Sequence, residues 1–308
     1  MQMLTKHRGE LYLVLGALIF AFNGIMATIV LEHLSPFRLA QVRSSTAFLI
    51  LLIITVLFDR KSLRVTRAEL PLLVAFGVTG FAAVQAGYFL GIQRGLPLSL
   101  VLIIEFTAPI WIALWIKYVR KAFVPQSMWV AIALSLFGLI LLAQVWQGLT
   151  FDGIGLLGAL FAALALTAYF LLGKKVGTTR STQSLTVWGF GMATLTWLVV
   201  MPIWKFPVEV FSIQMDLQGV FAGQFLPGWV LILWIVVMGT IIPYLLVIAG
   251  LRLLSESTTS VIGMLEPVFA GLLAWIWLAQ GWNAIQLTGG IIVLIGIYLA
   301  DRARLVAN

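Results

Sequence analysis

The sequence contains no cysteine and few charged residues. With no cysteine among its 308 residues, disulfides, thiolate metal sites and cysteine nucleophiles are all excluded. Charged residues make up 10% of the chain, whereas about 25% is usual in soluble domains. Hydrophobic residues make up 62%, and the mean hydropathy is +1.09. Such a chain has too little polar surface to cover itself in water, which predicts an integral membrane protein.

Histidine is also scarce, and nucleotide-binding signatures are missing from the sequence. The only histidines are His7 and His33, which both lie outside the long apolar runs. A histidine-based catalytic triad or a zinc protease motif therefore cannot be built within the membrane. The chain also lacks the glycine-rich P-loop that cradles phosphates. We expect no enzymatic activity, no metal and no cofactor.

Long apolar runs dominate the chain. A helix needs about twenty apolar residues to cross a bilayer, whereas strands of a membrane barrel are short and alternate in polarity. The first run is too long for the core of a signal peptide, so we interpret it as a span. The sequence predicts an all-α integral membrane fold with ten spans: Leu11–Leu31, Phe37–Phe58, Leu70–Ile92, Leu96–Tyr118, Ser127–Trp146, Ile154–Gly173, Gln183–Trp204, Gly228–Gly250, Ser257–Ala279 and Ile285–Ala300.

The basic residues predict the orientation of the chain. Its net charge of +8 would also suit nucleic-acid binding, but Lys and Arg in a multi-span protein concentrate in cytoplasmic loops. If the N-terminus is cytoplasmic, most of the 19 Lys and Arg residues fall in cytoplasmic loops, and the outer loops hold only Arg38, Arg94 and Lys205. We therefore expect both termini to be cytoplasmic, and we expect no nucleic-acid partner.

Short matches between the two halves of the chain indicate an internal repeat. The Gly-Ala-Leu run at 16–18 recurs at 158–160, Tyr88 of the third span matches Tyr244 of the eighth, and Pro109 of the fourth matches Pro267 of the ninth. Five spans per copy would place the two copies in opposite orientations. The sequence thus predicts two inverted five-helix repeats, 1–147 and 148–308, with substrate bound near the midplane between them.

Two glutamates are the main candidates for a functional site. Glu105 and Glu266 each lie roughly 12–14 Å inside a predicted span, approached from opposite faces of the membrane. An ionisable side chain at membrane depth is costly and usually functional. Each carboxylate could bind an ammonium group or exchange a proton as part of a cavity. The alternative is a structural carboxylate that is hydrogen-bonded to a neighbouring helix.

Further candidates are an arginine, several polar or aromatic residues and three prolines. Arg43, the basic residue predicted inside a span and away from its ends, either extends outward to the interface or pairs with Glu105 or a substrate carboxylate. Amides within spans more often bridge helices than bind ligands. Proline removes a helix hydrogen bond, so we expect Pro243 to break the eighth span near its middle. The remaining candidates are Asn23, Gln85, Tyr88, Thr107, Tyr169 and Tyr244 as substrate-binding residues, and Pro109 and Pro267 as helix-shaping residues.

These motifs resemble a known family. The ten-span, two-copy plan is similar to the EamA family of the drug/metabolite transporter superfamily. The segments 88–93 and 105–109, with Pro243-Tyr244 and 264–267, resemble its threonine/homoserine exporter branch. The resemblance implies a bacterial inner-membrane exporter of amino acids or related metabolites, driven by a proton gradient. The chain departs from the family at 117–120 and 278–281, where many members carry a glutamate, and at 21–22, where tryptophan-glycine is frequent.

The residues and the resemblance together predict a secondary active transporter that exports small metabolites by alternating access. Its partners would be a small-molecule substrate, the lipid bilayer and protons, and it would function as a monomer or a homodimer. An uptake carrier or facilitator for a nucleobase or an amine is an alternative. A channel is another alternative, but the sequence lacks the ring of charged residues that a channel would be expected to have. A membrane enzyme or lipid-handling scaffold would need a nucleophile–base pair or metal cluster, which the spans do not offer.

Overall fold

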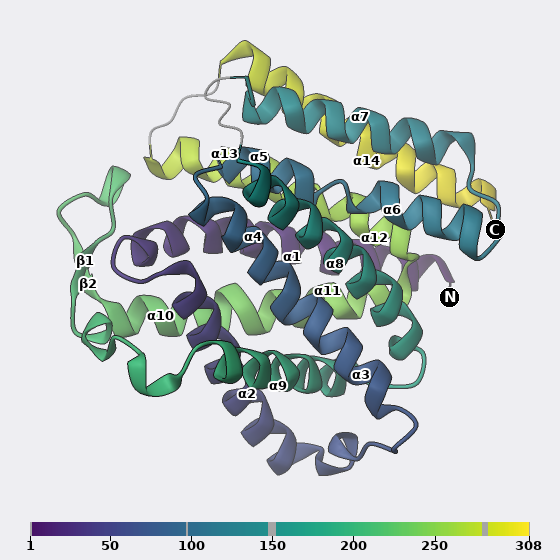
Figure 1. The fold of residues 1–308 in the computed structure, drawn as a ribbon. Helices are drawn as coiled ribbons and strands as arrows, with labels where there is room; N and C mark the ends of the chain where they lie inside the picture. The colour runs from purple at the N-terminus through teal and green to yellow at the C-terminus, as the bar shows by residue number, and fades with distance from the viewer. Residues whose placement is uncertain (1, 97, 147–151, 279–282, 308) are drawn as a thin grey trace.

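A computed structural model of the protein describes residues 2–96, 98–146, 152–278 and 283–307, and they form a bundle of α-helices (Figure 1). Within these residues, nine helices are long and apolar enough to cross a membrane. This fits the predicted helical integral membrane protein. The nine are His7–Leu31, Pro36–Phe58, Leu70–Gln93, Leu100–Val119, Gln126–Ala143, Gly153–Gly177, Gly228–Leu253, Glu256–Trp277 and Ala284–Ala303.

The predicted span Gln183–Trp204 is the one that does not appear among these nine. Its residues form helix α9, Thr182–Val200, which is 19 residues long. The helix carries five threonines and serines and one glutamine, which lower its hydropathy. It packs lengthwise against α2, Pro36–Phe58, and also contacts α3, Leu70–Gly77. The sequence therefore located the helix correctly, and the count of ten spans stays a prediction.

The helices are of two kinds: those that are α-helical throughout, here called continuous, and those that contain a π-helical segment or a break, here called interrupted. Besides α2 and α9, the continuous helices are α1 (Gln2–Leu31), α7 (Gln126–Ala143), α8 (Gly153–Gly177) and α14 (Ala284–Ala307). Two interrupted helices lie in the first half of the chain: α3–η2–α4 (Leu70–Gly77, Val78–Ala83, Val84–Gln93) and α5–α6–η3 (Leu98–Glu105, Ala108–Leu114, Trp115–Val119). Two more lie in the second half: α10–η7–α11 (Gly228–Val236, Val237–Ile241, Ile242–Leu253) and α12–α13 (Glu256–Gly263, Leu265–Leu278). The segments η2, η3 and η7 are π-helical.

The long connection between α9 and α10, residues 201–227, is built from short elements. It contains the short 3-10 helices η4 (Ile203–Lys205), η5 (Val208–Phe211) and η6 (Gly219–Phe221) and a two-stranded antiparallel hairpin. In the hairpin, β1 (Gln214–Asp216) pairs with β2 (Phe225–Pro227). The Asp216 carboxylate accepts hydrogen bonds from the backbone amides of Gln218 and Gly223, which closes the turn. In Figure 1 the hairpin lies at the end of the bundle opposite both chain termini.

Glycines set how closely two of the helices approach. A Cβ on Gly87 would lie 2.5 Å from the carbonyl oxygen of Gly158, so α4 and α8 pack backbone to backbone there. Gly91 faces α5 and α8 in the same way, through Val101 and Gly155. Gly95 continues this four-residue spacing in the sequence, but it has a positive φ of 82° and a Cβ there would meet open space. It allows the turn after α4 and does not pack a helix.

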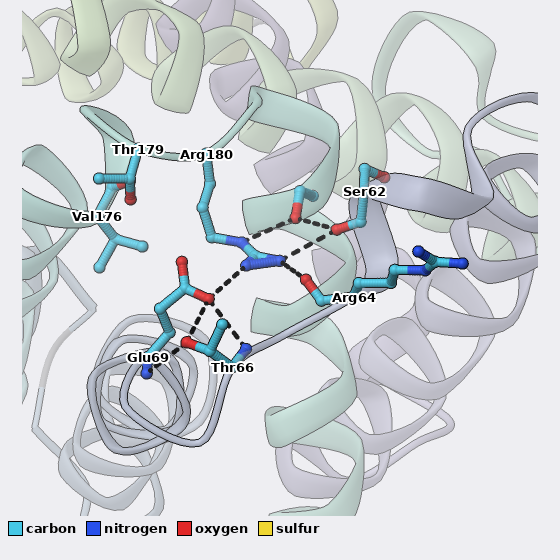
Figure 2. A network of polar contacts seen from close by, with 8 residues as sticks. Ser62, Arg64, Thr66, Glu69, Val176, Thr179 and Arg180 are labelled. Atoms are coloured by element: carbon cyan, nitrogen blue, oxygen red, sulfur yellow. Dashed lines mark hydrogen bonds and ion pairs between the residues drawn. The ribbon is translucent and has the colours of Figure 1, made fainter.

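At the terminal end of the bundle, meaning the end that holds both chain termini, a buried arginine joins two connections (Figure 2). Arg180, between α8 and α9, donates to the backbone oxygens of Ser62 and Arg64 at 3.2 and 2.6 Å. It also donates to the Ser184 hydroxyl and lies 3.5 Å from the Glu69 carboxylate. The connection that contains the 3-10 helix η1, Arg60–Leu63, is thereby fixed to the start of α9.

The Glu69 carboxylate has a second role at the same place. The backbone amide and the hydroxyl of Thr66 both donate to it, and together they lower the pKa of Glu69, with a smaller contribution from Arg180. Because the pKa of the folded state is lowered, this stabilisation is present above the ordinary glutamate pKa and is lost as the pH falls through the lowered value.

We predict that Arg180→Lys destabilises the protein. An ammonium group cannot replace the planar fork that reaches two carbonyl oxygens and a hydroxyl at once, and unmet buried hydrogen bonds cost about 1–3 kcal/mol. The melting temperature of the purified variant in nanodiscs should fall by several degrees. Arg64→Lys is the matched control, since it changes an exposed side chain and keeps the backbone oxygen that Arg180 contacts. Equal melting temperatures for Arg180→Lys and wild type would contradict the prediction.

Candidate functional site

A cavity of about 280 Å³ lies at the centre of the bundle. It is bordered by α1, α2, α4, α5, α6, α8, α11, α12 and α13, so both halves of the chain contribute to it. The lining is largely apolar, with a small set of polar and charged side chains. Ligand sites in proteins have this general composition. The charged residues of the lining are Arg43, Glu105 and Glu266.

The two glutamates lie next to the helix interruptions. Glu105 is the last residue of α5, and Glu266 is the second residue of α13. In a continuous helix, residue 109 would donate its backbone amide to the Glu105 carbonyl, but proline has no amide hydrogen. Pro267 likewise leaves the Gly263 carbonyl without its helix donor. The backbone opens near those points, at Phe106 and Thr107 in one helix and at Met264 in the other. This is consistent with the predicted helix-shaping role of these two prolines.

In the structure Arg43 neither extends outward to the interface nor pairs with Glu105, and its pairing with a substrate carboxylate stays a prediction. Its side chain is buried, its Nε donates to the Thr240 hydroxyl at 2.9 Å, and its Nη2 donates to the Gly239 carbonyl at 3.3 Å. Among the described residues no ion pair joins it to Glu105. Arg43 therefore does not extend outward to the interface but connects α2 to the π-helical segment η7.

Pro243 explains why Arg43 binds there. An α-helix would pair the Gly239 carbonyl with the amide four residues later, and proline has none at that position. The structure corrects the prediction that Pro243 breaks the span, because η7 continues directly into α11 through a π-turn. The Thr240 hydroxyl donates to the Ile235 carbonyl at 2.8 Å within the same segment. A guanidinium group and a π-turn thus take the place of a break.

Two amide side chains were predicted at the site, and both line the cavity. Asn23 on α1 is 6% exposed, and its Oδ1 has no hydrogen-bond partner in the described part of the chain. It lies against Gly239 so closely that a Cβ on this glycine would collide with the amide. Gln85 on α4 donates to the Phe81 carbonyl at 3.0 Å.

Three tyrosines form an aromatic wall of the cavity. Tyr244 stacks on Phe81 with ring centroids 4.6 Å apart, and Tyr169 stacks on Phe76 at 5.3 Å. Tyr88 contributes a third ring beside them. The Tyr169 hydroxyl is buried and has no partner among the described residues. All the substrate-binding residues predicted from the sequence therefore line one cavity, with the exception of Thr107.

Thr107 has a local role at the helix interruption. Its hydroxyl donates to the Ile104 carbonyl at 2.6 Å and accepts a hydrogen bond from the Trp111 indole at 3.2 Å. Of the three prolines, Pro109 also lines the cavity. Pro243 and Pro267 belong to the helices around it without contributing to its surface.

Sequence reasoning missed a polar stripe on α12. Residues 256–260, Glu-Ser-Thr-Thr-Ser, are all buried, and Thr259, Ser260 and Gly263 line the cavity. Glu256, Ser260 and Gly263 follow one another at intervals of three or four residues and so share one face of α12. Glu266 comes three residues later, near the start of α13. The sequence signal that could have revealed this stripe is the run of four hydroxyl residues, 257–260, inside an apolar segment.

The stripe ends at an ion pair. Arg120, just after η3, donates to the Glu256 carboxylate at 2.7 Å, and Glu256 is buried while Arg120 is partly exposed. The pair joins the terminal-end segments of two interrupted helices, α5–α6–η3 and α12–α13. A series of polar groups thus connects the terminal end of the bundle with the cavity carboxylate of Glu266.

Comparisons with known proteins agree with this architecture. The chain is 26% identical over 291 residues to the uncharacterized transporter YdfC of Bacillus subtilis (strain 168), covering 92% of this chain and 87% of the relative. It is 22% identical to the uncharacterized inner membrane transporter YicL of Salmonella typhimurium, covering 96% and 95%. A solved structure described as "Crystal structure of protein" matches with a TM-score of 0.78 at 15% identity over 98% of this chain and 99% of that one, which shows a shared fold.

The comparison with protein families covers most of the sequence. Residues 7–144 and 153–300 each match the EamA-like transporter family. The two matches lie on either side of residues 147–151, which fall outside the described part of the structure. The chain therefore belongs to the EamA-like transporter family.

Proposed function

We propose that this membrane transporter is a secondary active exporter that moves a small metabolite through the central cavity by alternating access. The observation that carries the proposal is the pair of carboxylates, Glu105 and Glu266, placed at helix interruptions in one cavity. Interrupted helices near the midplane are the usual binding sites of secondary transporters. Membership of the family and the names of the relatives support a transporter.

The proposal includes ten spans in two inverted repeats, 1–147 and 148–308. The separate family matches support two copies. So does the reciprocity of the packing: α1 contacts α11 and α13, while α8, its counterpart in the second copy, contacts α4 and α5. The interruptions also correspond, because the third helix of each copy contains a π-segment and the fourth is broken beside a proline. In this arrangement α9 is the tenth span.

For location and orientation we propose the inner membrane of a bacterium, with the terminal end of the bundle in the cytoplasm. Both termini lie at the same end in Figure 1. The basic residues of the sequence concentrate in the connections predicted on that side. The hairpin β1–β2 would then face outward.

As substrates we propose amino acids or related small metabolites, with the two carboxylates coupling transport to protons. The resemblance of 105–109 and 264–267 to exporters of threonine and homoserine supports this choice. Uptake or facilitated diffusion would use the same cavity in the opposite direction.

We predict that Glu105→Gln and Glu266→Gln each lower the transport rate at least tenfold while the melting temperature stays close to that of wild type. Glutamine keeps the shape of the side chain but can neither carry a negative charge nor exchange a proton. Flux of amino acids in proteoliposomes, with and without a pH gradient, measures the effect. Glu209→Gln, which changes an exposed carboxylate in η5, is the control. Wild-type rates in both cavity variants would reduce the glutamates to structural roles, and no flux in wild type would refute the transport function.

Alternating access requires that the cavity open at the terminal end at some stage. The Arg120–Glu256 ion pair joins two of the interrupted helices at that end, and we propose that its 2.7 Å contact separates when the cavity opens there. If Glu256, the buried partner, loses its charge, the Arg120 side chain can leave it and be solvated by water. The closed state should therefore lose stability relative to the open one.

We predict that Glu256→Gln increases access to the cavity from the terminal end. The absence of native cysteine allows a single Ser260→Cys probe on the stripe of α12, and a membrane-impermeant maleimide added to inverted vesicles should label it several-fold faster when Glu256→Gln is also present. Glu209→Gln in the same Ser260→Cys background should leave the rate unchanged. Equal labelling rates with and without Glu256→Gln would show that the ion pair does not control this opening.

A further inference from the structure

We propose that the cavity recognises a protonated amine on its substrate and has no need of a substrate carboxylate. The proposal deepens the proposed function, because it names the substrate class of the same cavity. It follows from which charges of the lining are already used within the protein and which are available to a ligand.

The negative charges are available. Glu105 and Glu266 line the cavity from two different interrupted helices, and in the described part of the chain neither carboxylate forms an ion pair with a basic side chain. Each lies at the end of a helical segment, with its side chain in the lining. Two carboxylates that meet in one apolar cavity repel each other, so a bound cation between them relieves the repulsion.

The positively charged side chain of the lining is held in place by the protein itself. Arg43 is the only basic residue of the lining, and two of its three nitrogens donate to Thr240 and Gly239. Gly239 depends on this contact because Pro243 leaves its carbonyl without the usual helix donor. A substrate carboxylate that drew the guanidinium away would leave two buried acceptors of η7 unmet, which is unfavourable.

The uncharged groups also favour a donor. The buried Asn23 Oδ1 and the Tyr169 hydroxyl have no partner among the described residues, and both residues line the cavity. An ammonium group offers three donors and no acceptor, so it can satisfy oxygens of this kind. The rings of Tyr88 and Tyr244 line the same cavity, and aromatic rings attract cations. The apolar remainder of the lining suits an aromatic or alkyl body.

Three probes of similar shape test the proposal: phenethylamine carries only the amine, phenylalanine carries both groups, and 3-phenylpropionate carries only the carboxylate. Calorimetric titration of the full-length protein in nanodiscs should show phenethylamine binding at least as tightly as phenylalanine. It should show 3-phenylpropionate binding at least tenfold more weakly. Glu105→Gln and Glu266→Gln should each weaken phenethylamine binding at least tenfold, and Glu209→Gln should leave it unchanged. If a glutamine variant fails to fold, the ranking of the three probes on wild type decides alone.

Three results would overturn the proposal: tighter binding of phenylalanine than of phenethylamine, binding of 3-phenylpropionate as tight as that of the amine, or no binding of any probe. The failure of this proposal can be told apart from the failure of the transport function. Flux of amino acids in proteoliposomes that phenethylamine does not inhibit would refute amine recognition and leave transport intact. Tight binding of phenethylamine without flux of any solute would refute the transport function and leave amine recognition intact.

Discussion

The backbone of this protein has to satisfy its own hydrogen bonds at membrane depth, because the hydrocarbon offers no water to do so. Three prolines, Pro109, Pro243 and Pro267, each withdraw one amide from an apolar helix. The structure responds in two ways. Beside Pro109 and Pro267 the helix opens and the cavity forms, whereas at Pro243 a π-turn and a guanidinium group preserve the helix. The position of the cavity follows from where these amides are missing.

The use of Arg43 as a backbone partner determines the electrostatics of the cavity. A basic residue buried inside a span would normally be interpreted as a ligand for anions. Here its hydrogen bonds join α2 to η7, and the Thr240 hydroxyl in turn holds the Ile235 carbonyl. The guanidinium therefore stabilises the contact between two helices from different halves of the chain. What remains for a ligand is the negative charge of the two glutamates and the unpaired oxygens beside them.

The sequence predicted the helices and most of the residues that line the cavity, because apolar runs and isolated polar groups are local signals. It did not predict the partner of Arg43, which lies 196 residues away, or the π-turn by which the helix passes Pro243 without a break. Both depend on packing between distant segments. The hairpin around Asp216 was missed because its strands are three residues long. The stripe on α12 was missed because serine and threonine can satisfy themselves within a helix, as Thr259 does through the Ser255 carbonyl.

The two carboxylates differ in the helix end at which they lie. Glu105 ends α5, where the carbonyl groups of the helix point toward it, whereas Glu266 begins α13, where amide groups do. The second helix end therefore favours negative charge, and the first disfavours it. A bound cation consequently relieves more unfavourable charge at Glu105 than at Glu266. We propose that this asymmetry makes Glu105 the carboxylate that responds more strongly to the arrival and departure of the substrate.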